Sequence, residues 1–104
     1  MATSGEFCDY VMENLTRAGE VRIRKMMGEY LLYCRDKLIG SICDNILLVK
    51  ITPGSERLLP NAERMYPYEG SRNLMLAVED TEDTALMSAL LETLYAELPE
   101  AKKK

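Results

Sequence analysis

The first hydrophobic pattern along the chain has the period of a helix. Positions suited to one buried face recur at intervals of three and four, namely Phe7, Tyr10, Val11, Asn14, Leu15 and Ala18. Thr3 and Glu6 have the spacing of a capping box, Ser4 is an alternative cap, and Gly19 can end the helix in the left-handed conformation. We therefore predict a helix over residues 5–18.

The pattern changes to a period of two at Val21 and predicts four strands in succession. These runs cover 21–26, 30–34, 38–43 and 46–51. In the first run, Arg22 and Arg24 alternate with apolar residues, which gives one charged face, and Gly28 behind it is expected to provide a bend or bulge. Two-residue polar turns separate the later runs and are too short for the crossover that parallel pairing needs. The runs therefore predict a meander of antiparallel hairpins.

The second half of the chain predicts one more strand and one more long helix. A helical turn over 55–59 is stopped by Pro60, residues 60–72 are loop by composition, and a strand covers 74–78. An acidic cluster at 79–83 suits a helix start, and the apolar stripe behind it consists of Leu86, Met87, Leu90, Leu91, Leu94 and Leu98, closed by Pro99. The predicted class is α+β, with helices packed on an antiparallel meander sheet in the order α-β-β-β-β-(short α)-β-α. We expect a single domain over 1–104, ordered from about residue 4 to 99, with a solvated tail at 100–104.

Composition and charge exclude several function classes. The chain has 104 residues, of which 47% are apolar, so a single core is within reach without metal or disulfide staples. Its net charge of −4 disfavours long-range attraction to nucleic acid. The N-terminus has no signal-peptide pattern, and the longest aliphatic run, residues 46–49, is too short to cross a membrane. These observations predict a soluble, cytoplasmic protein.

Histidine and cysteine usage predicts that the protein is not an enzyme. The chain contains no histidine, which removes the usual general base and the commonest metal ligand. Cys8, Cys34 and Cys43 form an odd set without C-x-x-C spacing, which fits free thiols in a reducing cytoplasm. Pairing around the turn at 35–36 would place Cys34 opposite Lys37 and Cys43 opposite Gly28. The two thiols would then lie about 20 Å apart, too far for a disulfide. We expect no catalytic, cofactor or metal site.

Three surface features have both a functional and a structural interpretation. The basic residues around 22–25, with Arg17 nearby, suggest nucleic-acid binding, but a solvated strand face is favoured because no phosphate loop or aromatic RNA-binding motif accompanies them. The acidic cluster lacks the ligand order of an EF-hand, so a favourable interaction with the helix dipole explains it. Four tyrosines, at 30, 33, 66 and 68, suggest a recognition surface, although packing is favoured. We expect one of Tyr30 and Tyr33 in the core and the other exposed.

The strand region resembles the N-terminal domain of the TfoX/Sxy family, over residues 4–99. The resemblance rests on Arg24-Lys25-Met26-Met27-Gly28-Glu29-Tyr30-Leu31-Leu32-Tyr33-Cys34, Lys37, Ile42-Cys43-Asp44-Asn45, Leu48, Lys50, Pro67-Tyr68-Glu69-Gly70-Ser71-Arg72 and Leu98-Pro99. The chain departs from the family at Met27, where Phe is usual, at Leu32, where Gly is usual, and at 35–36, where Asp-Gly is usual. We expect it to differ from the two-domain regulators also in having no counterpart of their C-terminal domain.

The resemblance implies a fold like that of secretion chaperones and a regulatory role in bacteria, associated with competence and transcription. It brings no catalytic residues. We therefore expect a non-enzymatic module that acts by protein–protein interaction, with a surface made of Arg24, Lys25, Glu29, Tyr30 and Tyr33. Homodimerisation through a bare edge strand stays open. One alternative is nucleic-acid binding through the strand around Arg22–Lys25. Another is a small-ligand-binding protein or enzyme that uses loop 60–72.

Overall fold

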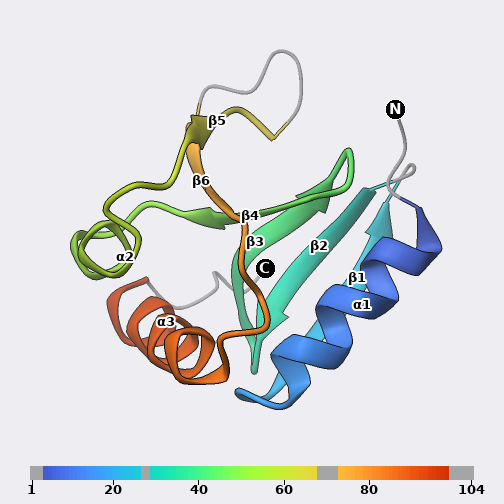
Figure 1. Ribbon diagram of the computed structural model, residues 1–104, viewed down its shortest axis with the longest axis horizontal. Coiled ribbons are helices and arrows are strands. Elements are labelled where there is room, and N and C mark those ends of the chain that lie inside the picture. The colour runs from blue at the N-terminus through green and yellow to red at the C-terminus, as the bar shows by residue number, and fades with distance from the viewer. Residues whose placement is uncertain (1–3, 27–28, 68–72, 99–104) are drawn as a thin grey trace, which may run out of the picture.

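Six antiparallel strands form a single sheet in the computed structural model, which describes residues 4–26, 29–67 and 73–98 (Figure 1). The strand order across the sheet is β1-β2-β3-β4-β6-β5. The strands are β1 (Val21–Met26), β2 (Glu29–Cys34), β3 (Lys37–Cys43), β4 (Ile46–Lys50), β5 (Arg64–Met65) and β6 (Met75–Val78). The predicted antiparallel meander and the α+β class are confirmed.

In the described part of the chain, three helices accompany the sheet: α1 (Gly5–Thr16), α2 (Pro53–Leu58) and α3 (Thr84–Glu97). Ser4, the alternative cap, begins α1 by accepting a hydrogen bond from the Phe7 backbone N–H at 3.1 Å. Asp83 caps α3, so this helix begins at the acidic cluster, where a helix start was predicted. α1 ends two residues earlier than predicted. Tyr10 is wrongly placed on its buried face, because the ring is 45% exposed and its hydroxyl donates to Glu82 at 2.6 Å.

The main core lies between α1, α3 and one face of the sheet, which we call the covered face. It comprises Cys8, Val11, Leu15, Leu32, Cys34, Ile39, Ile42, Leu47, Val49, Leu76, Val78, Met87, Leu90, Leu91 and Leu94. A second cluster occupies the opposite, open face and draws only on strands, with Cys43, Leu48, Met75 and Ala77 at its centre and Ile46 and Met65 beside them. The sheet is therefore apolar on both faces, and α1 and α3 cover one of them.

The turns follow the polar pairs of the sequence, but the register contains a bulge. Asp44 and Asn45 have φ values of 51° and 59°, as a type I′ turn requires. Between β2 and β3, Leu32 pairs with Gly40 while Tyr33 pairs with Leu38, so Ile39 is an extra residue. The predicted register is therefore right at the Cys34–Lys37 pair and wrong beyond the bulge. The position assigned to Gly28, opposite Cys43, lies outside the described residues.

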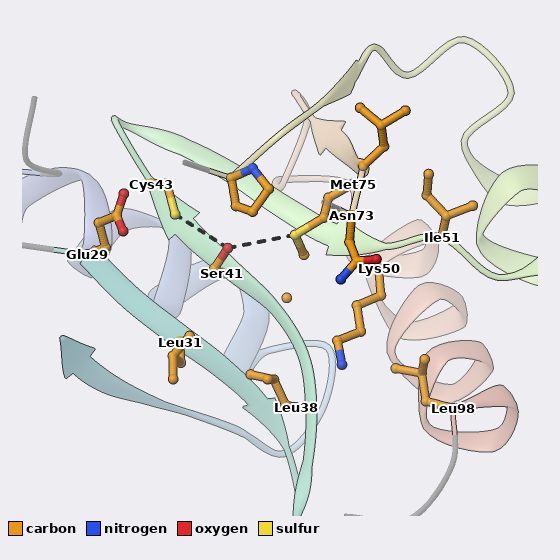
Figure 2. Close-up of a pocket in the computed structure, with 13 residues that line it drawn as sticks. Glu29, Leu31, Leu38, Ser41, Cys43, Lys50, Ile51, Asn73, Met75 and Leu98 are labelled. Carbon is orange, nitrogen blue, oxygen red and sulfur yellow. Dashed lines mark hydrogen bonds between the residues drawn. The ribbon is translucent and has the colours of Figure 1, made fainter. Parts of the chain in front are cut away.

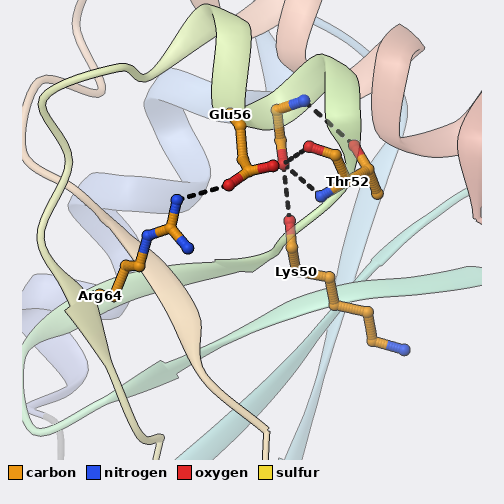
Figure 3. Close-up of polar contacts among 5 residues, drawn as sticks. Lys50, Thr52, Glu56 and Arg64 are labelled. Carbon is orange, nitrogen blue, oxygen red and sulfur yellow. Dashed lines mark hydrogen bonds and ion pairs between the residues drawn. The ribbon is translucent and has the colours of Figure 1, made fainter.

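The segment between β4 and β6 differs most from the prediction. The short helix begins at Pro53 rather than at 55, because Thr52 and Ser55 form a reciprocal capping box (Figure 3). Loop 60–72 contains β5, which pairs with β6 and is joined to α2 by the ion pair of Arg64 with Glu56. Backbone pairing across distant segments gives no compositional signal, which explains why β5 was missed.

A buried lysine ties the end of α3 to the turn between β2 and β3. Lys37 is 9% exposed, and its ammonium donates to the backbone carbonyls of Tyr95 at 2.6 Å and Leu98 at 2.8 Å. The same nitrogen lies 4.5 Å from the centroid of the Tyr95 ring, and the Arg35 guanidinium carbon lies 4.6 Å from it. A cation near a helix C-terminus also interacts favourably with the helix dipole. These contacts hold Leu98 beside the open face.

Candidate binding site on the open face of the sheet

A cavity of about 620 Å³ lies on the open face (Figure 2). Its floor is formed by β2 and β3, and residues from β4, β6 and their flanking segments complete its walls. The lining residues are Glu29, Leu31, Leu38, Gly40, Ser41, Cys43, Lys50, Ile51, Pro67, Asn73, Leu74, Met75 and Leu98. A cavity of this size is within the range of sites that bind small molecules.

Strand alternation directs the floor residues to this face. Successive side chains of a strand point to opposite faces. Ser41 and Cys43 therefore project to the open face of β3, while Ile42 between them enters the main core. Leu31 on β2 pairs with Ser41 and shares its face. The bulge interrupts the strict alternation, so that Ile39 enters the main core and Leu38 reaches the cavity.

The two ends of the cavity carry opposite charges. Figure 2 shows the Lys50 side chain extending between Leu38 and Leu98, whereas Glu29 lies at the other end beside Cys43. The Lys50 backbone carbonyl accepts a hydrogen bond from Ser55 Oγ at 3.0 Å, which anchors this residue while its side chain points away from α2 (Figure 3). Within the described part of the chain, no ion pair or hydrogen bond engages the Lys50 ammonium.

The thiol in the cavity is held in its protonated form. Burial raises the pKa of Cys43, and the neighbouring Glu29 carboxylate raises it further, while a hydrogen bond with Ser41 acts in the opposite direction. The thiol donates to Ser41 Oγ at 3.4 Å. A protonated thiol is a poor nucleophile.

Among the described residues, no group of three or more histidine, cysteine, aspartate or glutamate side chains is placed to hold a metal ion. The cavity, with its apolar lining and a charged side chain at each end, is suited to binding a ligand or a partner side chain.

The predicted interaction surface is divided between the two faces of the sheet. Lys25 pairs with Tyr30, and Tyr30 packs against the main core, so both belong to the covered face. Arg24, Glu29 and Tyr33 alternate with them and belong to the open face, where Glu29 lines the cavity. The structure therefore brings three of the five predicted residues to the face that carries the cavity.

The prediction that either Tyr30 or Tyr33 is exposed is wrong, because both are half-buried. The guanidinium of Arg22 stacks on the Tyr33 ring, with its central carbon 4.7 Å from the ring centroid, and donates to the Arg35 carbonyl at 3.3 Å. An arginine stacked on an aromatic ring also buries apolar surface. Of the other two tyrosines, Tyr66 is 53% exposed and Tyr68 lies outside the described residues.

The basic residues around β1 do not form one continuous surface. Arg22 is engaged by Tyr33, Arg17 forms an exposed ion pair with Glu13 at 3.5 Å, and Lys25 lies on the opposite face from Arg24. A duplex or a single strand of nucleic acid requires several cations on one surface. This geometry disfavours the nucleic-acid interpretation.

The acidic cluster before α3 is used for local structure. Asp83 caps the helix, and Asp80 accepts a hydrogen bond from the Glu82 backbone N–H at 3.1 Å. Thr81 is buried and accepts from the Asn14 side chain at 2.8 Å. The Asn14–Thr81 hydrogen bond fastens the segment to α1, and the two aspartates order the start of α3.

Lys50 and the apolar floor were not recognised as site residues in the sequence. One signal was present, because Ile46–Val49 is a continuous apolar run, which is typical of strands that are covered on both faces. That run indicated a second apolar surface opposite the helices. The curvature and the flanking segments that make this surface a cavity have no counterpart in the local sequence.

The chain is similar to a bacterial protein over its whole length. It is 32% identical over 104 residues to an uncharacterised 12.7 kDa protein in the trpE 5′ region of Spirochaeta aurantia, and the match covers 90% of that relative. No protein-family model and no solved structure matches the chain. In the described residues, every helix is too short or too polar to cross a bilayer.

Proposed function

We propose that this chain, which belongs to the same family as the 12.7 kDa protein of Spirochaeta aurantia, is a non-enzymatic module that binds a protein partner through the open face of its sheet. The proposal includes a regulatory role like that of the TfoX/Sxy N-terminal domain, which the strand region resembles. Three buried, free thiols support a cytoplasmic location.

The observation that carries the proposal is the cavity on a sheet face that α1 and α3 leave uncovered. Leu31 and Leu38 are half-buried there, and Leu74 is 40% exposed. Burial of apolar surface by a partner is favourable by about 25 cal/mol for each Å² removed from water. Exposed apolar surface framed by polar residues is typical of interaction sites. The protonated Cys43 thiol and the lack of histidine support a binding role over catalysis.

The partner is proposed to be a different protein, not a second copy of this chain. β1 lies at one edge of the sheet, where Arg22, Arg24 and Lys25 would face the same cations of a second copy. Like charges at an edge oppose strand pairing. Charged residues of the open face, among them Arg24, Glu29 and Lys50, instead offer both signs to a heterologous partner.

Site-specific photo-crosslinking tests the proposal. A photoreactive amino acid replaces Leu38 in the cavity or, as a control, Glu13 on the exposed side of α1. In the bacterium that encodes the chain, we expect the Leu38 position to crosslink to a defined partner and the Glu13 position not to do so. The substitution Leu31→Asp should abolish the crosslink from position 38, with the fold checked by circular dichroism. Crosslinks that form equally at both positions would contradict the proposal.

A further inference from the structure

We infer that the cavity also binds a small monocarboxylic acid with an apolar body, whose carboxylate pairs with the Lys50 ammonium while its body lies on Leu38 and Met75. This ligand goes beyond the proposed protein partner. The three observations behind it are the Lys50 ammonium, which no described residue pairs with, the apolar lining, and the Glu29 carboxylate at the far end of the cavity.

The cation selects an acid. Lys50 extends into the cavity and has no ion-pair partner among the residues that the structure describes (Figure 2). The backbone carbonyls of Tyr95 and Leu98 at the end of α3 do not serve as acceptors for Lys50, because they already accept hydrogen bonds from Lys37. A carboxylate at this position would form a charge-assisted hydrogen bond, which is among the stronger polar contacts in proteins.

The lining selects an apolar body. Beyond the Lys50 ammonium, the cavity presents Leu31, Leu38, Met75 and Leu98. Its polar atoms on β3 are occupied with each other, since the Cys43 thiol donates to Ser41. Each methylene that enters such a lining should tighten binding about fourfold until the available length is filled.

Glu29 limits the ligand to one carboxylate. Glu29 on β2 and Lys50 on β4 lie two strand spacings apart, with β3 between them, and are offset by about four residues along the strands. Their Cα atoms therefore lie about 16 Å apart on strand geometry. A second carboxylate at the far end of the ligand would approach the like charge of Glu29. Like charges in a partly desolvated site repel strongly. A dicarboxylic acid of equal length should therefore bind more weakly than the monocarboxylic acid.

A titration with matched eight-carbon probes tests this inference. Binding is monitored by the NMR chemical shifts of the backbone amides. We expect octanoate to bind and to shift amides of β2, β3 and β4, and we expect octylamine and octanedioate to bind at least tenfold more weakly. Lys50→Met should weaken octanoate binding roughly 10- to 150-fold, the range for loss of a hydrogen bond to a charged group. Arg57→Met, which removes an exposed cation of α2 that does not line the cavity, should leave binding unchanged.

Several outcomes would overturn the inference. These are equal binding of octanoate and octylamine, unchanged octanoate binding in Lys50→Met, and the absence of amide shifts at millimolar octanoate. If Lys50→Met does not fold, Lys50→Arg keeps the charge and should retain octanoate binding. An acetylated trileucine with a free C-terminus that binds more tightly than octanoate would assign the site to a protein terminus, against a small acid. The crosslink from position 38 does not depend on octanoate, so the two proposals fail separately.

Discussion

Replacing Gly40 by alanine should greatly destabilise the protein, because no side chain fits between β3 and β4 at this point. Gly40 pairs with Val49 across the two strands. An added Cβ would lie far closer to the Leu48 carbonyl oxygen than van der Waals contact allows, and 3.0 Å from the Val49 Cα. Both neighbours are backbone atoms, so no change of rotamer relieves the overlap.

The expected loss follows from the ways in which the two strands can respond. Overpacking a dense interior costs about 1–3 kcal/mol. Moving β3 away from β4 also weakens ladder hydrogen bonds, each contributing about 1 kcal/mol net. We therefore expect Gly40→Ala to lower the free energy of unfolding by about 3 kcal/mol or more. For a domain of this size, that loss corresponds to a decrease in Tm of roughly 10–25 °C.

Urea denaturation followed by circular dichroism measures this loss, with two glycine controls. Gly5 begins α1 and has nothing within 4 Å of an added Cβ, so Gly5→Ala should be neutral or slightly stabilising. At Gly54 the overlap is with the side chains of Thr93 and Glu97, which can rotate, so an intermediate loss is expected. A loss below about 1 kcal/mol for Gly40→Ala, within the range of ordinary surface changes, would refute the reasoning about backbone contact.

Three further predictions concern the residues around the site. Lys37→Met should lower the free energy of unfolding by about 1–3 kcal/mol in urea denaturation, because it leaves two backbone carbonyls without their donor. Hydrogen bonds from Thr52 and from the Gly54 N–H lower the pKa of Glu97 below its ordinary 4.5. The carboxylate therefore stabilises the fold above pH 4.5, and this contribution is lost as the pH falls through the lowered pKa. Urea midpoints between pH 3 and 6 should consequently depend less on pH in Glu97→Gln. The raised pKa of Cys43 predicts slow reaction with Ellman's reagent in the native protein at pH 7 and fast reaction in urea.

Local sequence determined the strands and turns because their signals lie between neighbouring residues. The polar pair Asp44–Asn45 adopts the left-handed conformation that its hairpin needs, and Cys34 pairs with Lys37 as the turn predicts. Ser4, the alternative cap, begins α1, and Asp83 begins α3 within the acidic cluster where a helix start was predicted. Each of these features depends on a few adjacent side chains and on the fixed geometry of the backbone.

Contacts between segments far apart in the chain could not be predicted from the local sequence. The bulge at Ile39 shifts the register, because packing on both faces of β3 outweighs simple alternation. β5 exists only through its pairing with β6, and Lys37 is buried because the end of α3 supplies its acceptors. Whether a polar residue in a strand is solvated or buried depends on what lies across from it.

For the candidate site, the sequence by itself determined that the molecule has an α+β fold and that β4 is apolar on both faces. It also provided the residue types of the cavity, including a lysine at the end of an apolar run. Tertiary structure alone decided that Lys50 and Glu29 lie at opposite ends of a cavity. The physical reason is that a cavity is bounded by segments far apart in the chain, and its position depends on how they pack together.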